Sequence, residues 1–526
     1  MNALHQLLSR LFAQPLLLAP LLGAMAACGF EPLHLWPLTL LAMAGLIELI
    51  VRAPNWKRAA LIGWLFGVGH FSLGNNWIAI AFTYQANMPA WLGWVAVFGL
   101  SLYLAVYPLL ATLGAWCFRH RPIALVLSFG ATWIISEWLR SWVFTGFAWN
   151  PLGVAIAGPF ARPGMAVYSA WIGTYGLSGL LVMLAGCWWL ALRRGRIDWR
   201  GAILLAVPIA LALQPGAIAV SDPAGTTPFT LIQPNIAQDV LNNPANFETQ
   251  FIKTAQLSAP KSTGEQRLVL WPESGLPDYL REGYPEGFYA DRTYAGDPVI
   301  ARRRIGQVIG PGALLLTGAV DLEMRQGQVA AARNVVTVLD GAGAIRGSYA
   351  KAHLVPYGEY LPMREWLEPL GLARLVPGDI DFWPGPGPRT LDLGQMGKAG
   401  VQICYEIVFS GEVVDRANRP DFIFNPSNDG WFGGWGPPQH LAQARLRAIE
   451  EGLPVLRATT NGISAVIDGN GIVRQSIPRG IAGRIDGSLP PALPPTLFSR
   501  GGNMLPLGLA AALLGLALLV LRRARG

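Results

Sequence analysis

The chain has 526 residues, of which 52% are hydrophobic and 14% are charged, and its formal net charge is +8. This composition excludes an ordinary soluble protein of the same length and indicates a membrane protein. It gives no support to a nucleic-acid partner, because residues 221–500 hold 25 Lys and Arg against 28 Asp and Glu, whereas the rest of the chain holds 15 against 4. The positive charge therefore belongs to the membrane part and forms no basic face for phosphate backbones.

The first 220 residues contain a series of apolar runs, and each is close to the roughly 20 residues that cross a bilayer. The predicted spans are residues 11–30, 33–51, two spans within 59–118 on either side of a polar turn near 83–89, 122–139, 164–192, 201–220 and, after a polar middle section, 504–521. The sequence thus predicts a membrane domain of seven helices over residues 1–220, and an eighth helix with a basic tail over residues 501–526.

The charges of the predicted loops give their orientation. Basic residues recur on one side of the spans: Arg10, Arg52, Lys57, Arg58, Arg119, Arg121, Arg193, Arg194, Arg196, Arg200, Arg522, Arg523 and Arg525. Because Lys and Arg mark the cytoplasmic face and seven is an odd number, residues 221–500 are predicted to lie outside the cytoplasm. The first span is expected to be retained, since no clean Ala-x-Ala cleavage site follows it.

Residues 221–500 alternate short apolar runs with helix-like stretches. Strands are predicted at residues 229–232, 267–271, 313–320, 334–340, 401–404, 421–425, 453–459 and 464–468, and helices at 299–310 and 442–451. Val, Ile and Leu are enriched in the predicted strands, and Gly, Asn and Asp lie between them. This insert is therefore predicted to be a layered α/β domain with mixed strand pairing.

Cys404 ends a short apolar run and is the only cysteine of the insert; the other three cysteines lie in predicted spans. A lone cysteine in a strand is more often a packing residue than a catalyst. Glu273, which follows residues 267–272, and Lys351, which follows residues 345–350, however, also lie at the ends of strand-like segments. Each of these two charged residues, taken alone, is better explained as a surface residue, so the hypothesis of an acyl-transfer site depends on all three together.

These residue types suit nucleophilic catalysis. A thiol reacts as the thiolate, and a carboxylate shielded from water, such as Glu273, can take its proton. The tetrahedral intermediate needs positive charge and N–H donors at its oxyanion, which Lys351 and the backbone N–H of Tyr405 can supply. Glu359, eight residues after Lys351, can orient the lysine or assist proton transfer.

Several segments carry a resemblance to a known family. Trp-Pro-Glu-Ser at 271–274, the run from Tyr349 to Glu359, and Gln-Ile-Cys-Tyr-Glu at 402–406 resemble the three catalytic segments of nitrilase-like carbon–nitrogen hydrolases. With its flanking spans, the chain is most similar to their membrane-integrated branch, the apolipoprotein N-acyltransferases. Further matching segments are residues 144–153, 231–236, 425–433, 439–448 and 456–462. The resemblance implies an αββα sandwich for the insert.

The resemblance also implies a ping-pong reaction. Cys404 is expected to attack the sn-1 acyl ester of a phospholipid, usually phosphatidylethanolamine, with Glu273 as general base and Lys351 at the oxyanion. The acyl chain of the resulting thioester then passes to the α-amino group of an apolipoprotein's S-diacylglyceryl N-terminal cysteine. Glu359 matches a fourth catalytic position, and Tyr405 and Glu406 match positions that flank the nucleophile.

One position departs from the family pattern. The family often has Trp where this chain has Asn242, so that either a lid works differently here or a neighbouring aromatic replaces it. Trp431, Phe432 and Tyr360 lie in loops expected to cover the site. A last aromatic group is expected to form either an acyl-binding mouth or an interfacial belt: Trp138, Trp142, Phe144, Phe147 and Trp149.

Other expectations concern ligands, partners and location. His353 and His440 occur singly, without metal-ligand spacing, so that no metal or cofactor is predicted, and His353 is interpreted as structural. The expected partners are the phospholipid donor, the diacylglyceryl apolipoproteins and the bilayer, and the expected oligomeric state is a monomer. The implied location is the inner membrane of a Gram-negative bacterium, with the insert in the periplasm.

Two other functions fit part of the sequence. A membrane-anchored amidase of the nitrilase type would use the same residues with water as second substrate, although one helix would then suffice as an anchor. A transporter or receptor with a decayed nitrilase fold would be expected to show inverted repeats or ionisable residues at mid-membrane, and neither is found in the sequence.

Overall fold

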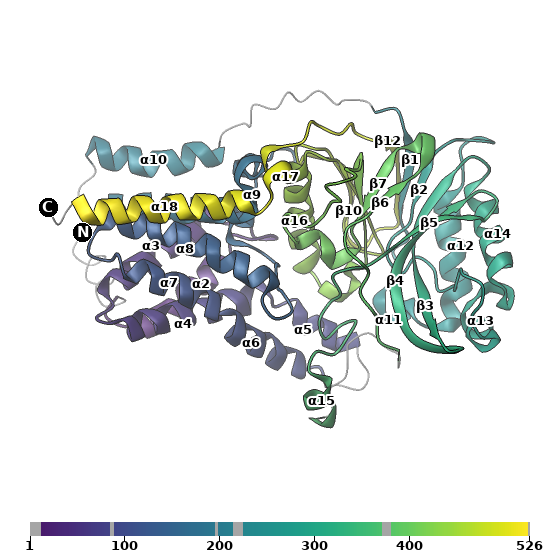
Figure 1. Cartoon of the computed structure of the whole chain (residues 1–526), viewed down its shortest axis with the longest axis horizontal. Helices are drawn as coiled ribbons and strands as arrows, with labels where there is room; N and C mark the ends of the chain where they lie inside the picture. Colours follow the sequence, from purple (N-terminus) through teal and green to yellow (C-terminus); the bar gives the residue numbers. More distant parts are fainter. Residues whose placement is uncertain (1–11, 85–88, 195–197, 214–224, 371–379, 524–526) are drawn as a thin grey trace.

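The structure is a computed structural model that describes residues 12–84, 89–194, 198–213, 225–370 and 380–523. A bundle of helices and an α/β domain lie side by side along the longest axis (Figure 1). The first and the last residues that the structure describes lie at the far end of the helical bundle, away from the α/β domain. The final helix therefore returns from the α/β domain to the bundle and packs there against two of its helices.

The helical bundle is built from apolar helices whose bounds follow the predicted spans. They are α2 (Pro15–Ala27), α3 (Trp36–Arg52), α4 (Trp56–Gly74), α6 (Leu92–Leu104), α7 (Val106–Trp116), α8 (Pro122–Trp142), α9 (Ser169–Arg193), α10 (Trp199–Leu213) and α18 (Met504–Arg523). The helices α6 and α7 follow one another directly and together match one predicted span. Counted in this way, the helices of the described residues are consistent with the predicted count of eight spans. Part of the predicted polar turn and residues 214–220 lie outside the described residues.

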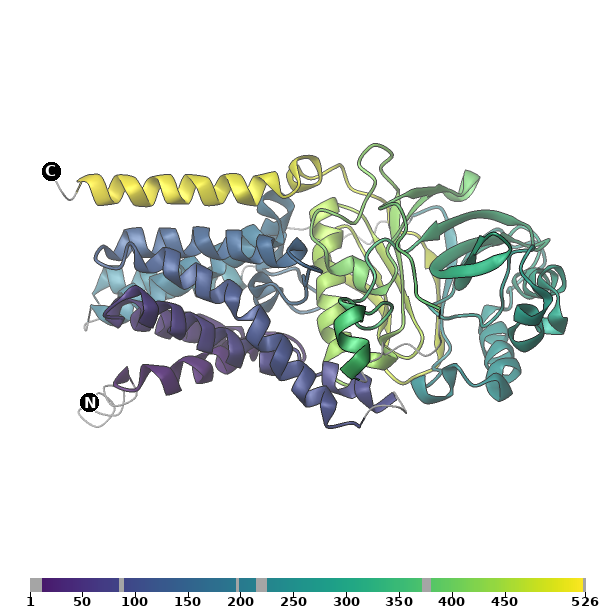
Figure 2. The same ribbon diagram turned by 60° about the horizontal axis from the view of Figure 1, so that its bottom comes forward.

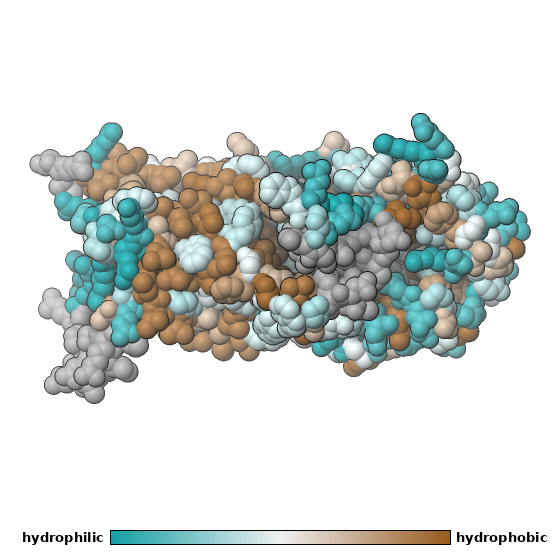
Figure 3. Space-filling view, turned by 90° about the horizontal axis from the view of Figure 1, so that it is seen from below, coloured by the Kyte–Doolittle hydropathy of each residue, from teal (hydrophilic) through white to brown (hydrophobic). Residues whose placement is uncertain are grey.

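Length and composition identify the helices that can cross a bilayer. Within the described residues, four continuous helical segments qualify: 92–116, 122–142, 165–193 and 504–523. The apolar helices 15–27 and 199–211 are shorter. On the face shown in Figure 3, hydrophobic side chains cover most of the helical half between its hydrophilic far end and the more polar α/β half. This distribution is typical of a protein whose helical part lies in lipid.

Small residues bring α2 and α4 into close contact. A Cβ atom added at Gly23 would lie 1.9 Å from the carbonyl oxygen of Phe66, and one added at Gly69 would lie 2.0 Å from that of Pro20. Helices in lipid associate through such close backbone approach, because hydrocarbon tails offer no hydrophobic driving force between helices. These two glycines therefore set the spacing at this helix pair.

The α/β domain consists of two six-stranded sheets. The first has the order β12-β1-β2-β3-β4-β5 and comprises β12 (Gly483–Ser488), β1 (Pro228–Gln233), β2 (Leu268–Leu270), β3 (Leu314–Arg325), β4 (Gln328–Asp340) and β5 (Ile345–Ala350). The second has the order β11-β10-β9-β8-β7-β6 and comprises β11 (Val473–Ile477), β10 (Ser464–Ile467), β9 (Val455–Thr459), β8 (Phe422–Ser427), β7 (Lys398–Val401) and β6 (Thr390–Asp392). Parallel and antiparallel pairs occur in both sheets, as predicted.

Helices cover the outer faces of the two sheets. The helices α12 (Phe247–Ser258), α13 (Glu286–Arg292) and α14 (Pro298–Ile309) lie beside the first sheet at the outer end of the molecule, and α16 (Gly436–Glu451) lies beside the second sheet (Figure 1). The predicted αββα sandwich is confirmed. One predicted strand was misplaced: β7 ends at Val401, and Cys404 instead opens the 3₁₀ turn η8 (Cys404–Val408).

The helix α16 joins the two halves of the molecule and stands between the membrane helices and the second sheet (Figure 2). Its buried Arg445 donates hydrogen bonds to the carbonyl oxygens of Gly158, Pro159 and Arg162 at 2.7, 2.8 and 3.0 Å. Its Glu450 accepts a hydrogen bond from the backbone N–H of Thr174 at 2.7 Å. The α/β domain is therefore held on the bundle by buried polar contacts as well as by apolar packing.

Candidate active site

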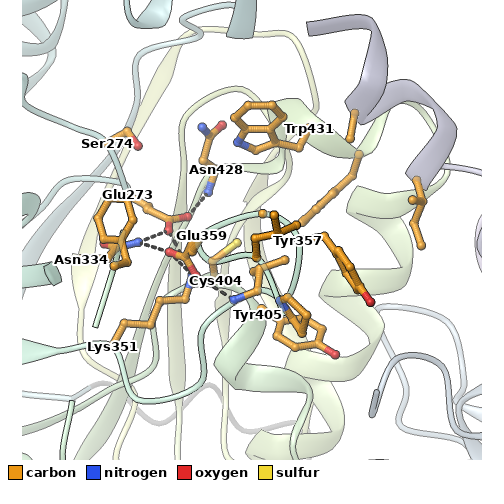
Figure 4. Close-up of a pocket in the computed structure, with 18 of the residues that line it drawn as sticks. Glu273, Ser274, Asn334, Lys351, Tyr357, Glu359, Cys404, Tyr405, Asn428 and Trp431 are labelled. Carbon is orange, nitrogen blue, oxygen red and sulfur yellow. Dashed lines mark hydrogen bonds and ion pairs between the residues drawn. The ribbon is translucent and has the colours of Figure 1, made fainter. Parts of the chain in front are cut away.

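Three predicted catalytic residues meet at one edge of the sheets (Figure 4). Glu273 lies just beyond the end of β2, Lys351 directly follows β5, and Cys404 follows β7. Because β2 and β3 are parallel and β4 reverses direction before β5, the ends of β2 and β5 point the same way. The structure thus brings together residues that are more than 50 positions apart in the sequence, and it buries all three.

Lys351 lies between two carboxylates. Its Nζ is 3.0 Å from the carboxylate of Glu359 and 3.5 Å from Oε1 of Glu273. Asn334 donates from Nδ2 to both carboxylates, at 2.8 Å to Glu273 and 2.9 Å to Glu359. The backbone N–H of Asn428 donates to the second oxygen of Glu273 at 2.9 Å. Each carboxylate is therefore held in one orientation toward the lysine.

The charges of this group influence one another strongly because all of them are buried. Burial by itself would lower the pKa of Lys351, but the carboxylates of Glu359 and then Glu273 raise it above its ordinary value. Lys351 is therefore a fixed cation at every physiological pH. A cation held in a water-poor site is suited to stabilise the negative charge of an oxyanion.

Cys404 is held in an unusual backbone conformation. Its φ angle is +51°, in the left-handed region that side chains with a Cβ rarely adopt, and this region is often found at functional positions. Burial, and next the charge of Glu273, raise the pKa of the thiol well above its ordinary value, whereas Lys351 and the backbone N–H of Asn428 oppose this rise. The resting nucleophile is therefore a neutral thiol that needs a base, and the neighbouring Glu273 is such a group.

The two residues after the nucleophile have different surroundings. Tyr405 lines the cavity, and its Oη lies 3.5 Å from the carbonyl oxygen of Gly146 in the membrane part. Glu406 points away from the cavity and accepts hydrogen bonds from Tyr349 Oη at 2.8 Å and from the backbone N–H of Ala352 and Ile403 at 2.7 Å each. Glu406 thus ties the turn with Cys404 to the segment that follows Lys351.

A cavity of about 1150 Å³ opens at Cys404. One wall consists of apolar side chains of α6 and of the segment 143–147, both from the membrane part, and the other walls come from the α/β domain. On α6 the lining positions are Leu92, Val95, Ala96, Gly99, Leu100 and Tyr103, which share one helix face. The cavity therefore extends from the catalytic group to a helix of the bundle.

The predicted aromatic contacts divide into two groups. Trp431 and Phe432 line the cavity, and so do Phe144 and Phe147. Tyr360 and Trp149 are not among the lining residues, so the predicted contact of these two side chains with substrate is not supported. Trp138 and Trp142 pack against each other with their ring centroids 5.3 Å apart, and likewise are not among the lining residues.

The position of Trp149 has a clear physical reason. Its side chain is fully buried, its Nε1–H donates to Gln439 at 2.8 Å, and its ring packs against Trp77 and Phe432. It therefore supports the cavity wall from behind. Asn242, at the position where the family often has Trp, does line the cavity, together with the nearby Phe247.

Sequence reasoning missed three contributors to the site. Asn334 bridges the two carboxylates, the backbone of Asn428 holds Glu273, and His440 lies 3.0 Å from the carbonyl oxygen of Cys404. Asn428 and His440 lie inside segments that resemble the family, and this resemblance could have pointed to them from the sequence alone. Asn334 lies in none of these segments. The side chain of His353 stacks on Phe409 and pairs with Glu412 at 3.2 Å, in agreement with its structural interpretation.

Comparison with known proteins agrees with the resemblance. A profile of the apolipoprotein N-acyltransferase N-terminal domain matches residues 22–215, and a profile of the carbon–nitrogen hydrolase domain matches residues 230–483. A protein of Rhodopseudomonas palustris named apolipoprotein N-acyltransferase is 34% identical over 97% of this chain and 95% of its own length. A protein of Bradyrhizobium diazoefficiens with the same name is 35% identical over 96% of this chain and 94% of its own length.

Among solved structures, an amidase of the nitrilase superfamily from Nesterenkonia aligns with 52% of this chain and 94% of its own length, at 18% identity and a TM-score of 0.35. The relatives that match nearly the whole chain confirm the predicted family. This chain belongs to the apolipoprotein N-acyltransferase family of bacterial membrane enzymes.

Proposed function

We propose that the protein transfers an acyl chain from the sn-1 position of a phospholipid, such as phosphatidylethanolamine, to the α-amino group of the S-diacylglyceryl N-terminal cysteine of apolipoproteins. The observation that carries this proposal is the buried group of Cys404, Glu273 and Lys351 in a cavity with an apolar wall from the membrane helix α6. A lipid can enter such a cavity with its chains on the apolar wall and its ester at the nucleophile.

In the first half-reaction Glu273 takes the proton of the Cys404 thiol, and the sulfur attacks the ester carbonyl carbon. The oxyanion of the tetrahedral intermediate lies between the ammonium group of Lys351 and the backbone N–H of Tyr405. When the intermediate collapses, the C–O bond breaks and Glu273 returns the proton to the leaving oxygen. The products are a thioester on Cys404 and a lysophospholipid.

In the second half-reaction the α-amino group of the apolipoprotein attacks the thioester carbonyl carbon. Glu273 takes a proton from the amine, and the same two donors hold the oxyanion. The C–S bond then breaks, the proton passes to the sulfur, and the product is an amide. Glu359 and Asn334 keep Lys351 and Glu273 in place through both steps, as supported by their contacts of 2.8 to 3.0 Å.

The proposed location is the inner membrane of a Gram-negative bacterium, with the α/β domain in the periplasm. The charge of the loops supports this orientation, since basic residues recur in the predicted loops on the side of the spans opposite to residues 221–500. We further propose three parts: a membrane domain over residues 1–220, a catalytic domain over 221–500 and a C-terminal helix with a basic tail over 501–526. The proposed oligomeric state is a monomer.

The mass of the intact protein after incubation with phosphatidylethanolamine alone tests this function. A fatty-acyl increment on the peptide that contains Cys404, removed when a diacylglyceryl lipopeptide is added, is the expected result. The Cys404→Ala variant should be inserted and folded but gain no increment. A wild-type protein that leaves the phospholipid intact, or a Cys404→Ala variant that still acylates the lipopeptide, would contradict the proposal, and the former result would turn attention to small amides as substrates.

A further inference from the structure

His440 on α16 contacts the backbone of the nucleophile. Its Nε2 lies 3.0 Å from the carbonyl oxygen of Cys404, and the nearest other side-chain donor, Nδ2 of Asn425, lies 3.5 Å from the same oxygen. The Nδ1 of His440 lies 3.0 Å from both Arg457 Nη2 and Asp429 Oδ1. His440, Arg457 and Asp429 are all at most 1% exposed, so water does not compete for these contacts.

These partners determine where the imidazole carries its proton. A carbonyl oxygen can only accept, so Nε2 carries the hydrogen and donates it to Cys404. Nδ1 faces two partners, the guanidinium of Arg457, which can only donate, and the carboxylate of Asp429, which can only accept. The Nε2–H that is donated to Cys404 is present whichever of the two Nδ1 pairs with. Arg457 also donates to both carboxylate oxygens of Asp429 at 2.7 Å. Burial, and next the charge of Arg457, lower the pKa of His440, which agrees with a neutral ring.

The carbonyl of Cys404 and the N–H of Tyr405 belong to the same peptide group. A peptide group is planar and trans, so its C=O and N–H point in opposite directions and turn together. The left-handed φ of +51° at Cys404 leaves this peptide in a strained setting that neighbouring contacts must maintain. A hydrogen bond that fixes the carbonyl therefore also fixes the direction of the Tyr405 N–H.

We propose that His440 is a positioning residue for catalysis: by donating its Nε2–H to the Cys404 carbonyl, it aims the backbone N–H of Tyr405 at the oxyanion. This inference rests on the proposed function, in which that N–H stabilises the tetrahedral intermediate. Arg457 and Asp429 have the supporting role of holding the ring of His440 in place through Nδ1. Both half-reactions pass through an oxyanion, so both depend on this alignment.

The surroundings of His440 allow its hydrogen bond to be separated from its packing. The ring centroid of His440 lies 5.2 Å from that of Trp149 and 5.7 Å from that of Phe432. His440→Phe keeps an aromatic ring between these neighbours but removes the donor. His440→Gln keeps a donor on a flexible side chain of similar reach. His353, whose side chain pairs with Glu412 instead, offers the matched controls His353→Phe and His353→Gln.

The test compares two reactions of the same sulfur in the full-length protein in detergent. Thioester formation from phosphatidylethanolamine passes through an oxyanion, whereas alkylation of Cys404 by iodoacetamide does not. We expect His440→Phe to form the thioester at least tenfold more slowly at an unchanged KM for the lipid, while the alkylation rate of the Cys404 peptide stays within about twofold. His440→Gln should recover part of the lost rate, and both His353 variants should match the wild type.

Variants that elute as a single species with the wild-type melting temperature enter the comparison, and two replacements at His440 are available in case one does not fold. Equal thioester rates in wild type and His440→Phe would overturn the inference. Acylation and alkylation that fall in the same proportion would also overturn it, since His440 would then only support the fold. A wild-type protein that is alkylated at Cys404 but forms no thioester would overturn the proposed function itself.

Discussion

The ammonium group of Lys351 lies 3.0 Å from the carboxylate of Glu359, and both side chains are buried. The two residues are separated by a loop, and their meeting brings the segment after β5 back toward the catalytic edge of the sheet. Because Glu273 also contacts this ammonium group, at 3.5 Å, one cation is shared between two carboxylates. The contributions of the three side chains to stability and to catalysis should therefore be separable by substitution.

Replacement of Lys351 by methionine should cost both activity and stability. It removes the cation that pairs with two buried carboxylates, and breaking a buried charge pair in this way costs about 3–5 kcal/mol. Thermal and urea unfolding in detergent would measure the loss, and thioester formation should fall below detection. Lys351→Arg retains the positive charge, so this variant should keep more of the wild-type stability than of the wild-type activity. Wild-type stability of Lys351→Met would contradict the burial and pairing described for this side chain.

Glu273 and Glu359 should differ in their effect on the first half-reaction. Glu273→Gln removes the group proposed to take the thiol proton, so thioester formation should fall about 10²–10⁴-fold. Glu359→Gln leaves that group in place and only weakens the hold on Lys351, so its loss should be smaller. Rapid-quench measurement of the Cys404 thioester gives both rates, with the exposed Glu282→Gln as control. If the rate of thioester formation fell further in Glu359→Gln than in Glu273→Gln, Glu359 would be the base and Glu273 the residue that holds Lys351.

Gly99 on α6 lines the cavity, and an added Cβ there would meet no heavy atom within 4 Å. The leucine side chain of Gly99→Leu should therefore occupy part of the cavity beside its apolar wall without disturbing the helix packing. We expect KM to rise about tenfold for long-chain phospholipids and less for short-chain ones, which is the scale of a few methylene contacts. Gly508→Leu on α18 is the matched control, since Gly508 also has open space around it but does not line the cavity. Equal effects of both substitutions on KM would argue against acyl binding at α6.

Glu451 predicts a pH dependence of stability. Its side chain is 1% exposed, and its carboxylate oxygens have no hydrogen-bond partner among the residues that the structure describes. Burial, and next the charge of Glu450, raise its pKa to about 7, although Arg416, Arg447 and Arg419 oppose the rise. The folded protein therefore holds this proton more tightly than the unfolded chain, in which the pKa is near 4.5. The free energy of unfolding should therefore fall as the pH rises from about 4.5 to about 7, by at most about 3 kcal/mol, and level off at higher pH.

The Glu451→Gln variant removes this titration and tests the prediction. Its stability should match that of the wild type near pH 4.5 and exceed it above about pH 7. The melting temperature of both proteins in detergent across this range measures the difference. The exposed Glu365→Gln serves as control. A difference between Glu451→Gln and wild type that does not change with pH would show that this carboxyl group does not titrate in the window.

The sequence by itself determined the elements of this protein and the three reactive residues. Apolar runs of bilayer length, and shorter runs rich in Val, Ile and Leu between polar turns, are local patterns that depend only on neighbouring residues. Cys404, Glu273 and Lys351 could be identified because each lies at the end of a strand-like segment, and the ends of neighbouring strands gather at an edge of a sheet. The resemblance of their segments to one family then supplied the reaction.

Tertiary structure alone decided which polar groups support those three residues. Asn334 reaches Glu273 only because β4 passes beside β3, and His440 reaches the Cys404 carbonyl only because α16 packs behind the turn η8. The same packing placed Trp149 behind the cavity wall rather than in it. Such contacts join residues far apart in the chain through the exact direction of buried side chains, and a sequence pattern contains no record of that direction.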